Sequence, residues 1–253
     1  MLSCKSKKIN SKIELHVIDV KSLGDEITAF LDKHVVQICE GDSGSELELV
    51  KARFINFLES KDDKTRIGAV AEFFVHLYMR QCGFKQDFLF LNLEEGSIKK
   101  GFDGYFSKKN FTYIVESKSG SVLTKNISHK AKLKEAYNDL KAILAGEKSS
   151  NNPWRNAYNH ASHIDAAVAK PIRRKIKELS DSFDKKKFGT VDEFNIVPCS
   201  TIFLKEDWDD ALSNAILQEP PTFYAGFEAK TIMALCITKS SYQVFVEYLQ
   251  GGE

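Results

Sequence analysis

The sequence predicts an α/β fold, in which a small mixed sheet is flanked by helices. Apolar residues recur with helical spacing over residues 65–81 and 128–144. Between these segments lie two short runs rich in aromatic and β-branched residues, 102–107 and 111–118. Two such runs separated by a polar break indicate a β-hairpin. A chain of 253 residues can bury a substantial core, so we expect one elaborated domain.

Residues 1–64 are predicted to form an N-terminal elaboration of strand and helices. The alternation of apolar residues over 11–19 favours a strand, which we place at an edge of the sheet. Helical spacing over 25–39 and 45–58 predicts two packing helices, which are separated by glycines at 41–44. A polar link at 61–64 leads into the domain of residues 65–253, and we infer no chemistry from the elaboration.

The helix of residues 65–81 is expected to begin at Thr65 as its cap and to stop at Gly83. Glu72 falls at the border of its apolar stripe, so this carboxylate either leans toward a site at the sheet edge or reaches water. A first strand is predicted over 88–93. Together with the hairpin it forms a three-strand meander, which the helix of 128–144 follows.

The core needs one further strand, which is delayed by a helical insertion over about 150–190. The candidates are 195–204 and, as the alternative, 231–238. Pro198 moves the first candidate toward a sheet edge, because proline offers no N–H to a ladder. Short helices are expected over 208–217 and 240–249.

The register of the hairpin brings two acids together. If Lys109 and Asn110 are the loop residues, Lys108 faces Phe111, and counting back sets Asp103 opposite Glu116. Opposed side chains lie about 5 Å apart at Cβ, where like charges are destabilising, and a divalent cation would compensate.

Lys118 lies on the same side of the second hairpin strand as Glu116, ~6.6 Å away. The continuous apolar run before them indicates a strand buried on both faces, where charges need a partner or a metal. The alternative is that residues 101–104 form only a turn, and that Glu116 and Lys118 make a solvated ion pair.

Asp103 followed by Glu116-Ser117-Lys118 resembles the D…(D/E)-x-K signature of the PD-(D/E)XK nuclease superfamily. Phe102, rather than proline, precedes the aspartate, and Glu72 stands where many members place a further acid. This resemblance implies a restriction-endonuclease-like core of helix, three-strand meander, helix and further strand, with the helical insertion added to it.

Residues 66–145 are also similar to the HamA-like nuclease subunit of Hachiman-type bacterial anti-phage systems. The likeness lies in the Gly-Phe-Asp-Gly and Val-Glu-Ser-Lys segments and in the helix that follows. It implies an anti-phage role and a helicase partner that controls the nuclease. This chain has no G-x-x-x-x-G-K-[ST] loop, so we expect the partner to supply any ATP-driven step.

The expected activity is metal-dependent hydrolysis of DNA, in preference to RNA. Mg²⁺, or Mn²⁺ in its place, favours oxygen ligands. The fit of the carboxylates and the resemblance together assign the metal to Asp103, Glu116 and the carbonyl of Ser117. Lys118 would orient or deprotonate the attacking water or stabilise developing charge, and Glu72 would hold a second metal or a metal-bound water.

Basic residues follow the site. The net charge is +6 over Lys99–Lys148 and +5 over Lys170–Lys187. Such residues either track a nucleic-acid backbone or form an ordinary solvated surface. The residues predicted to contact nucleic acid are Lys125, Lys130, Lys132, Lys134, Arg173 and Arg174.

Other classes find less support. The sequence has no apolar run long enough to cross a membrane and no apolar segment behind its basic first ten residues, so we expect a cytoplasmic protein. The absence of a G-x-S-x-G motif argues against a serine hydrolase. Five dispersed cysteines suit neither disulfides nor a zinc site. His160 and His163, three residues apart on a predicted helix, could pair on a metal, but we expect them to pack or lie on the surface. Two alternatives remain: a non-enzymatic module on this fold that binds nucleic acid or protein, and an unrelated α/β enzyme.

Overall fold

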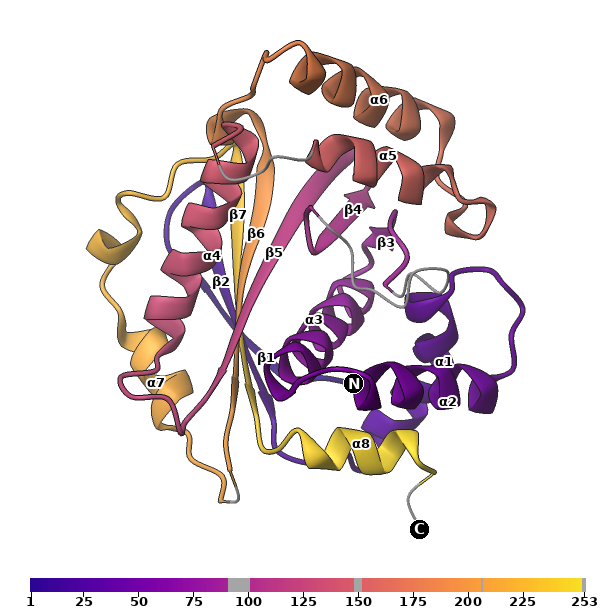
Figure 1. Ribbon diagram of the computed structural model, residues 1–253. Coiled ribbons are helices and arrows are strands. Elements are labelled where there is room, and N and C mark those ends of the chain that lie inside the picture. Colours follow the sequence, from indigo (N-terminus) through magenta and orange to yellow (C-terminus); the bar gives the residue numbers. More distant parts are fainter. Residues whose placement is uncertain (91–100, 148–151, 206, 252–253) are drawn as a thin grey trace.

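The computed structural model describes residues 1–90, 101–147, 152–205 and 207–251. Its centre is a seven-stranded mixed sheet with the strand order β1-β2-β7-β6-β5-β4-β3. Strands β2, β7, β6 and β5 run parallel, whereas β1, β4 and β3 pair antiparallel with their neighbours. Helices cover both faces of this sheet (Figure 1). The predicted α/β class is therefore confirmed.

The strands are β1 Cys4–Lys8, β2 Ile13–Val20, β3 Lys85–Gln86, β4 Gly104–Lys108, β5 Phe111–Ser121, β6 Asn195–Phe203 and β7 Thr231–Lys239. The helices are α1 Asp25–Cys39, α2 Leu47–Glu59, α3 Asp63–Gln81, α4 His129–Leu144, α5 Pro153–Ser162, α6 Lys170–Asp184, α7 Ala211–Gln218 and α8 Gln243–Leu249. Among the described residues, the 3-10 helices η1 Ile164–Ala166, η2 Val191–Glu193 and η3 Pro221–Tyr224 lie in the connections.

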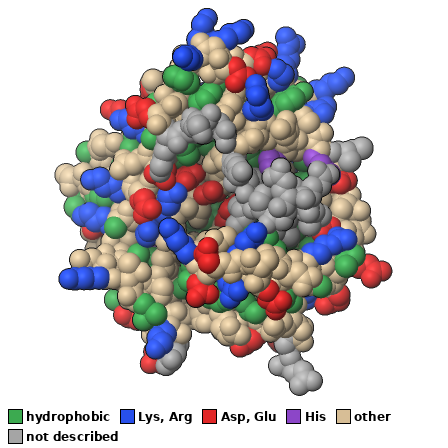
Figure 2. Space-filling model, in the orientation of Figure 1, with side chains coloured by type: hydrophobic (Ala, Val, Ile, Leu, Met, Phe, Trp, Pro, Cys, Tyr) green, Lys and Arg blue, Asp and Glu red, His purple; other side chains and the backbone are tan. Residues whose placement is uncertain are grey.

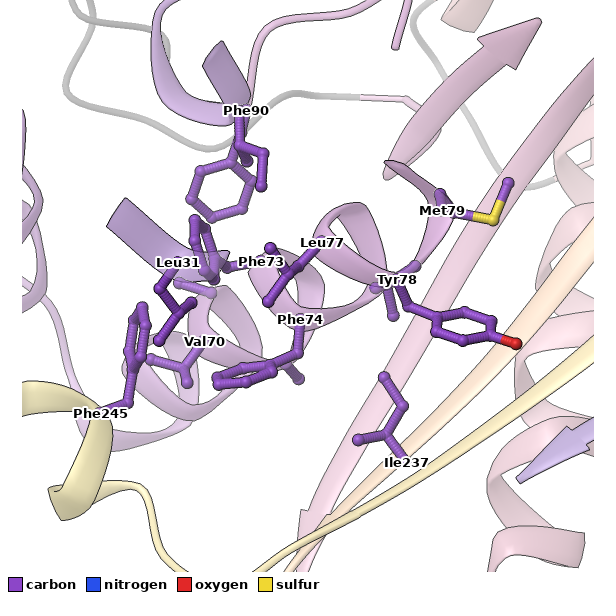
Figure 3. Packing of buried hydrophobic residues seen from close by; sticks show 14 of the residues in the cluster. Leu31, Val70, Phe73, Phe74, Leu77, Tyr78, Met79, Phe90, Ile237 and Phe245 are labelled. Carbon is purple, nitrogen blue, oxygen red and sulfur yellow. The ribbon is translucent and has the colours of Figure 1, made fainter. Parts of the chain in front are cut away.

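One apolar core lies between the sheet and α1, α2, α3 and α8. Figure 3 shows Phe73 and Phe74 of α3 beside Phe245 of α8, and their ring centroids lie 5.0 and 5.2 Å from that of Phe245. Helix α3 begins at Asp62, whose side chain accepts a hydrogen bond from the N–H of Thr65 at 2.8 Å. The cap is therefore Asp62, and the expectation of a Thr65 cap was wrong.

A second core fills the opposite face, under α4, α5, α6 and α7. Trp154 of α5 contacts the ring of Phe102, two residues before β4, with centroids 4.8 Å apart. Helices α5 and α6 occupy the region predicted as a helical insertion, and the order α3, hairpin, α4, β6 is the predicted core order.

Three strand predictions need correction. β2 is an interior strand, because β1, whose Cys-Lys-Ser-Lys-Lys sequence has no apolar alternation, lies outside it. The first meander strand is β3, residues 85–86, and not 88–93. Phe88, Leu89 and Phe90 are buried outside any strand, and residues 91–93 lie outside the described part of the chain.

β6, the first of the two candidates, is the strand next to β5, and it is not an edge strand despite Pro198. Its ladder with β7 is interrupted between Ile196 and Cys199, so the missing N–H of Pro198 falls at the gap. The alternative candidate, 231–238, forms β7 on the far side of β6.

Candidate functional site

The β4–β5 hairpin has the register that the sequence predicts. Lys108 pairs with Phe111, and the ladder continues to Gly104 opposite Val115. Asp103 is the next residue, and its N–H donates to the carbonyl of Val115 at 3.1 Å. β4 begins at Gly104 while β5 runs on to Ser121, so Asp103 stands where β5 passes beyond its partner strand.

The Asp103 carboxylate takes the place of a strand partner at this point. Its Oδ2 accepts the backbone N–H of Ser117 at 2.6 Å, which fixes the carboxylate against the edge of β5. The predicted site residues Asp103, Glu116 and Ser117 are therefore neighbours.

Glu116 is almost fully buried, with 4% of its surface exposed. Lys118 Nζ donates to Glu116 Oε1 at 2.6 Å and lies 2.8 Å from Asp139 Oδ2 of α4. The other oxygen of Glu116, Oε2, is buried and accepts no hydrogen bond from the described residues. Sequence reasoning missed Asp139, because its contact with Lys118 depends on how α4 packs on β5.

Burial is the main cause that raises the pKa of the Glu116 carboxyl, and the negative charge of Asp103 adds to it, while Lys118 opposes them. For Lys118, burial acts to lower the pKa, but the charges and hydrogen bonds of Glu116 and Asp139 outweigh burial and raise it. Lys118 is therefore an ammonium at neutral pH.

Glu72 approaches the site from α3 and is buried, with 4% of its surface exposed, so it does not reach water. A histidine that sequence reasoning missed lies between Glu72 and Asp103. His76 Nε2 is 3.1 Å from the Asp103 carbonyl and 3.6 Å from Glu72 Oε1. A carbonyl only accepts, so Nε2 carries the proton. The spacing of four residues between Glu72 and His76 on one helix was the available signal.

The residues predicted to contact nucleic acid lie on or before α4 and on α6, and three of them form ion pairs. Lys130 pairs with Glu219 at 2.9 Å, Lys132 with Glu135 at 2.8 Å, and Arg174 with Glu178 at 3.1 Å. Figure 2 shows basic side chains gathered over α6 at the top of the view, with acidic side chains among them. Within the described residues, Lys125, Lys134 and Arg173 form no ion pair.

A second buried polar cluster joins the start of α4 to the carboxyl ends of β2, β6 and β7. His129 Nδ1 lies 2.8 Å from Ser200 Oγ, and Nε2 lies 2.9 Å from Thr238 Oγ1. Thr238 contacts Ser213 Oγ at 2.7 Å, and Ser213 donates to Asp19 at 2.6 Å. Burial lowers the pKa of His129 to about 3, so the ring is neutral. We call this set the His129 cluster.

Other candidate groups are accounted for. His160 packs near the ring of Phe88 at 5.8 Å, and His163 lies 3.5 Å from Asp165. Cys39, Cys199 and Cys236 are buried, Cys82 is half-buried and Cys4 is exposed, and none of them forms a disulfide. The described part of the chain contains no cluster of three or more His, Cys, Asp or Glu suited to a metal. No described helix is long and apolar enough to span a membrane.

Residues 5–248 match the HamA protein family. The chain belongs to the HamA family. The match supports the resemblance to a Hachiman defence component and extends it from residues 66–145 to nearly the whole chain. A search of curated proteins found no match.

Proposed function

We propose that this HamA-family protein is a metal-dependent nuclease of the PD-(D/E)XK type that hydrolyses DNA in Hachiman anti-phage defence. One observation carries the proposal: Asp103 binds the main chain of β5 directly beside Glu116, whose buried Oε2 accepts no hydrogen bond from the described residues. A buried carboxylate oxygen without a donor is costly, and a cation offsets that cost.

The oxygen set fits Mg²⁺ or Mn²⁺. These ions bind through one or two carboxylates and retain waters and substrate phosphate, so a group of three acidic side chains is not required. Asp103, Glu116 and the Ser117 carbonyl would hold the ion. When bound, such an ion lowers the pKa of its water, orients that water and neutralises phosphate oxygens. In this proposal Glu72, whose Oε1 lies 3.6 Å from His76 Nε2, holds a second metal or a metal-bound water beside Asp103.

Lys118 acts as a positioned cation in this proposal. The charges of Glu116 and Asp139 raise the pKa of Lys118 and so favour its protonated form, and we therefore assign it orientation of the water and stabilisation of charge on the phosphate. Asp139 holds the ammonium from α4 at 2.8 Å. We also propose that a helicase partner delivers the DNA and controls its cleavage. This part of the proposal rests on the Hachiman association.

Calorimetric titration with Mn²⁺ tests the metal site without a substrate or an activator. We expect the wild type to bind, the Asp103→Ala/Glu116→Ala variant to lose binding, and an Asp25→Ala/Glu26→Ala control to keep it, since Asp25 and Glu26 are exposed at the start of α1. A well-folded wild type that fails to bind Mn²⁺, with DNA phosphate also supplied, would refute the metal site.

A binding module on the same fold is the second candidate. The observation that favours it is that Lys118 is neutralised internally by Glu116 and Asp139. Tight DNA binding that is unchanged by Asp103→Ala, with no metal-dependent cleavage, would select this candidate.

A further inference from the structure

A groove crosses the α3 face of the sheet beyond the end of α3. Helix α3 stops at Gln81, and Gly83, at φ +76°, turns the chain away. This leaves the first residues of β2, β7 and β5 without a helix above them. The groove has a volume of about 720 Å³, and its floor includes His16, Met233 and Tyr113. It spans three strand spacings, roughly 14 Å.

Two hairpin turns form the walls. The β1–β2 turn carries Lys8 and Lys12, and Asn10 Oδ1 fixes it by accepting from the N–H groups of Lys12 and Ile13 at 2.8 and 2.9 Å. The β4–β5 turn carries Lys108 and Lys109 on the other side. Both turns adjoin paired strand ends, so the backbone that carries these lysines is fixed on either side of the floor.

The walls carry a net positive charge. Across the residues that the structure describes, Lys8, Lys12, Lys108 and Lys109 form no ion pair, and Glu14 is the one acid that lines the groove. Glu14 stands opposite Lys8 in the β1–β2 ladder and lies 3.3 Å from His16 Nε2, and Lys108 Nζ donates to the Cys82 carbonyl at 2.7 Å. By contrast, three of the basic residues on α4 and α6, namely Lys130, Lys132 and Arg174, form ion pairs with carboxylates.

Aromatic rings complete the surface. Phe111 is 52% exposed at the groove, and Lys230 Nζ lies 6.0 Å from its ring centroid. Tyr113 is half-buried and meets Phe84 edge to face at 4.9 Å. Lysines beside an exposed ring are the combination that binds single strands, because the lysines contact phosphates and a base stacks on the ring.

We propose that this groove binds single-stranded nucleic acid. The proposal rests on the proposed nuclease function for its biological use, and it adds a site separate from Glu116 and Lys118. Tyr113 alternates along β5 with Ile114, so the groove and Glu116 are on opposite faces of the sheet. Phe111 and Glu116 are five residues apart on that strand, ~16 Å. In this proposal the groove binds one part of a single-stranded nucleic acid, and the candidate site at Glu116 and Lys118 cleaves another part of it.

The test is fluorescence anisotropy with a labelled oligothymidine strand in EDTA, so that cleavage and metal binding play no part. The Lys8→Gln/Lys12→Gln/Lys109→Gln variant should bind about ten-fold or more weakly, and the salt slope of its affinity should fall by ~2, since each phosphate contact on a single strand contributes ~0.7. A Lys33→Gln/Lys61→Gln/Lys64→Gln control removes the same charge outside the groove and should keep wild-type affinity.

Phe111→Ala tests stacking and should weaken single-strand binding about five-fold or more, with little effect on duplex binding. The Asp103→Ala/Glu116→Ala variant should bind the strand normally, so failure of the metal site and failure of the groove give different results. Equal losses in the two lysine triple variants, or no binding by the wild type, would overturn the proposal and leave an acidic protein partner as the occupant. A lysine effect without a Phe111 effect would overturn single-strand binding in favour of a duplex backbone.

Discussion

Helix α4 contributes to two buried polar clusters of opposite character. At its start, both ring nitrogens of His129 have hydroxyl partners at 2.8 and 2.9 Å, and burial lowers the pKa of the ring to about 3, so the imidazole carries no charge. Further along the helix, Asp139 and Glu116 both contact the Lys118 ammonium, and the charge of Asp103 acts on Glu116; we call these four residues the Asp103 group.

The difference separates a structural network from a candidate reaction centre. A buried polar network in which every member is satisfied stabilises and rigidifies a fold. The Asp103 group carries more negative charge than its lysine neutralises, and Glu116 Oε2 accepts no hydrogen bond within the described residues. The His129 cluster therefore needs nothing from outside, whereas the Asp103 group gains from a cation.

The largest expected effect is on cleavage. Replacing Lys118 with Ala should lower DNA cleavage by about 10³-fold or more while the fold persists, because it removes the positioned cation of the proposed reaction. Cleavage by the complex with its defence partner gives the rate, and circular dichroism checks folding. Near wild-type cleavage by this variant would remove Lys118 from the mechanism.

The His129 cluster should respond in stability instead. His129→Leu leaves the hydroxyls of Ser200 and Thr238 short of a partner, and we expect it to lower the free energy of unfolding by about 2 to 4 kcal/mol. Urea denaturation measures this loss. Mn²⁺ binding by the folded variant should stay at the wild-type level, and its loss would show that the two clusters are coupled through α4.

The same substitution should change the pH dependence of stability. The folded-state pKa of His129, about 3, is below the ordinary 6.5, so its stabilising contribution is complete above pH 6.5 and is lost as pH falls toward 3. The wild type should lose about 2 kcal/mol from this group between pH 7 and pH 5, at roughly 1.4 kcal/mol per pH unit. His129→Leu removes this contribution. Equal pH slopes for the two proteins in urea titrations would contradict the neutral buried ring.

The smallest expected effect concerns Asp139. Asp139→Asn keeps the shape of the side chain but weakens its hold on Lys118, so we expect cleavage to fall about ten-fold with Mn²⁺ affinity unchanged. Single-turnover rates across pH, together with Mn²⁺ titration, separate this positioning role from a ligand role. A loss of metal affinity equal to that of Asp103→Ala would make Asp139 a ligand.

The sequence specified the local part of the candidate site. A two-residue hairpin loop fixes the register of its strands, so the meeting of Asp103 and Glu116 followed from counting residues. The contact between Lys118 and Asp139 spans separate elements and depends on helix placement, which periodicity does not give. Likewise, Glu72 at the border of a helix stripe was ambiguous until the burial of α3 was known.

The errors in the fold have similar causes. Phe88 and Phe90 suggested a strand by residue type, but Phe90 fills the core beside Phe54 and Phe73 without strand pairing. Pro198 suggested an edge strand, yet β6 is interior, because the missing N–H of this proline falls in a gap of the β6–β7 ladder. The hydroxyls of Ser200 and Thr238 look like ordinary residues of apolar strands, and only the packing of α4 shows that they bind His129.

The two edge strands of the sheet affect whether copies of the protein can associate edge to edge. β1 exposes a lysine-rich edge, and β3 at the other edge is only two residues long. Two β1 strands brought together would set lysine against lysine, and a two-residue strand offers little template for pairing. These two edges therefore disfavour edge-to-edge pairing between copies of the sheet.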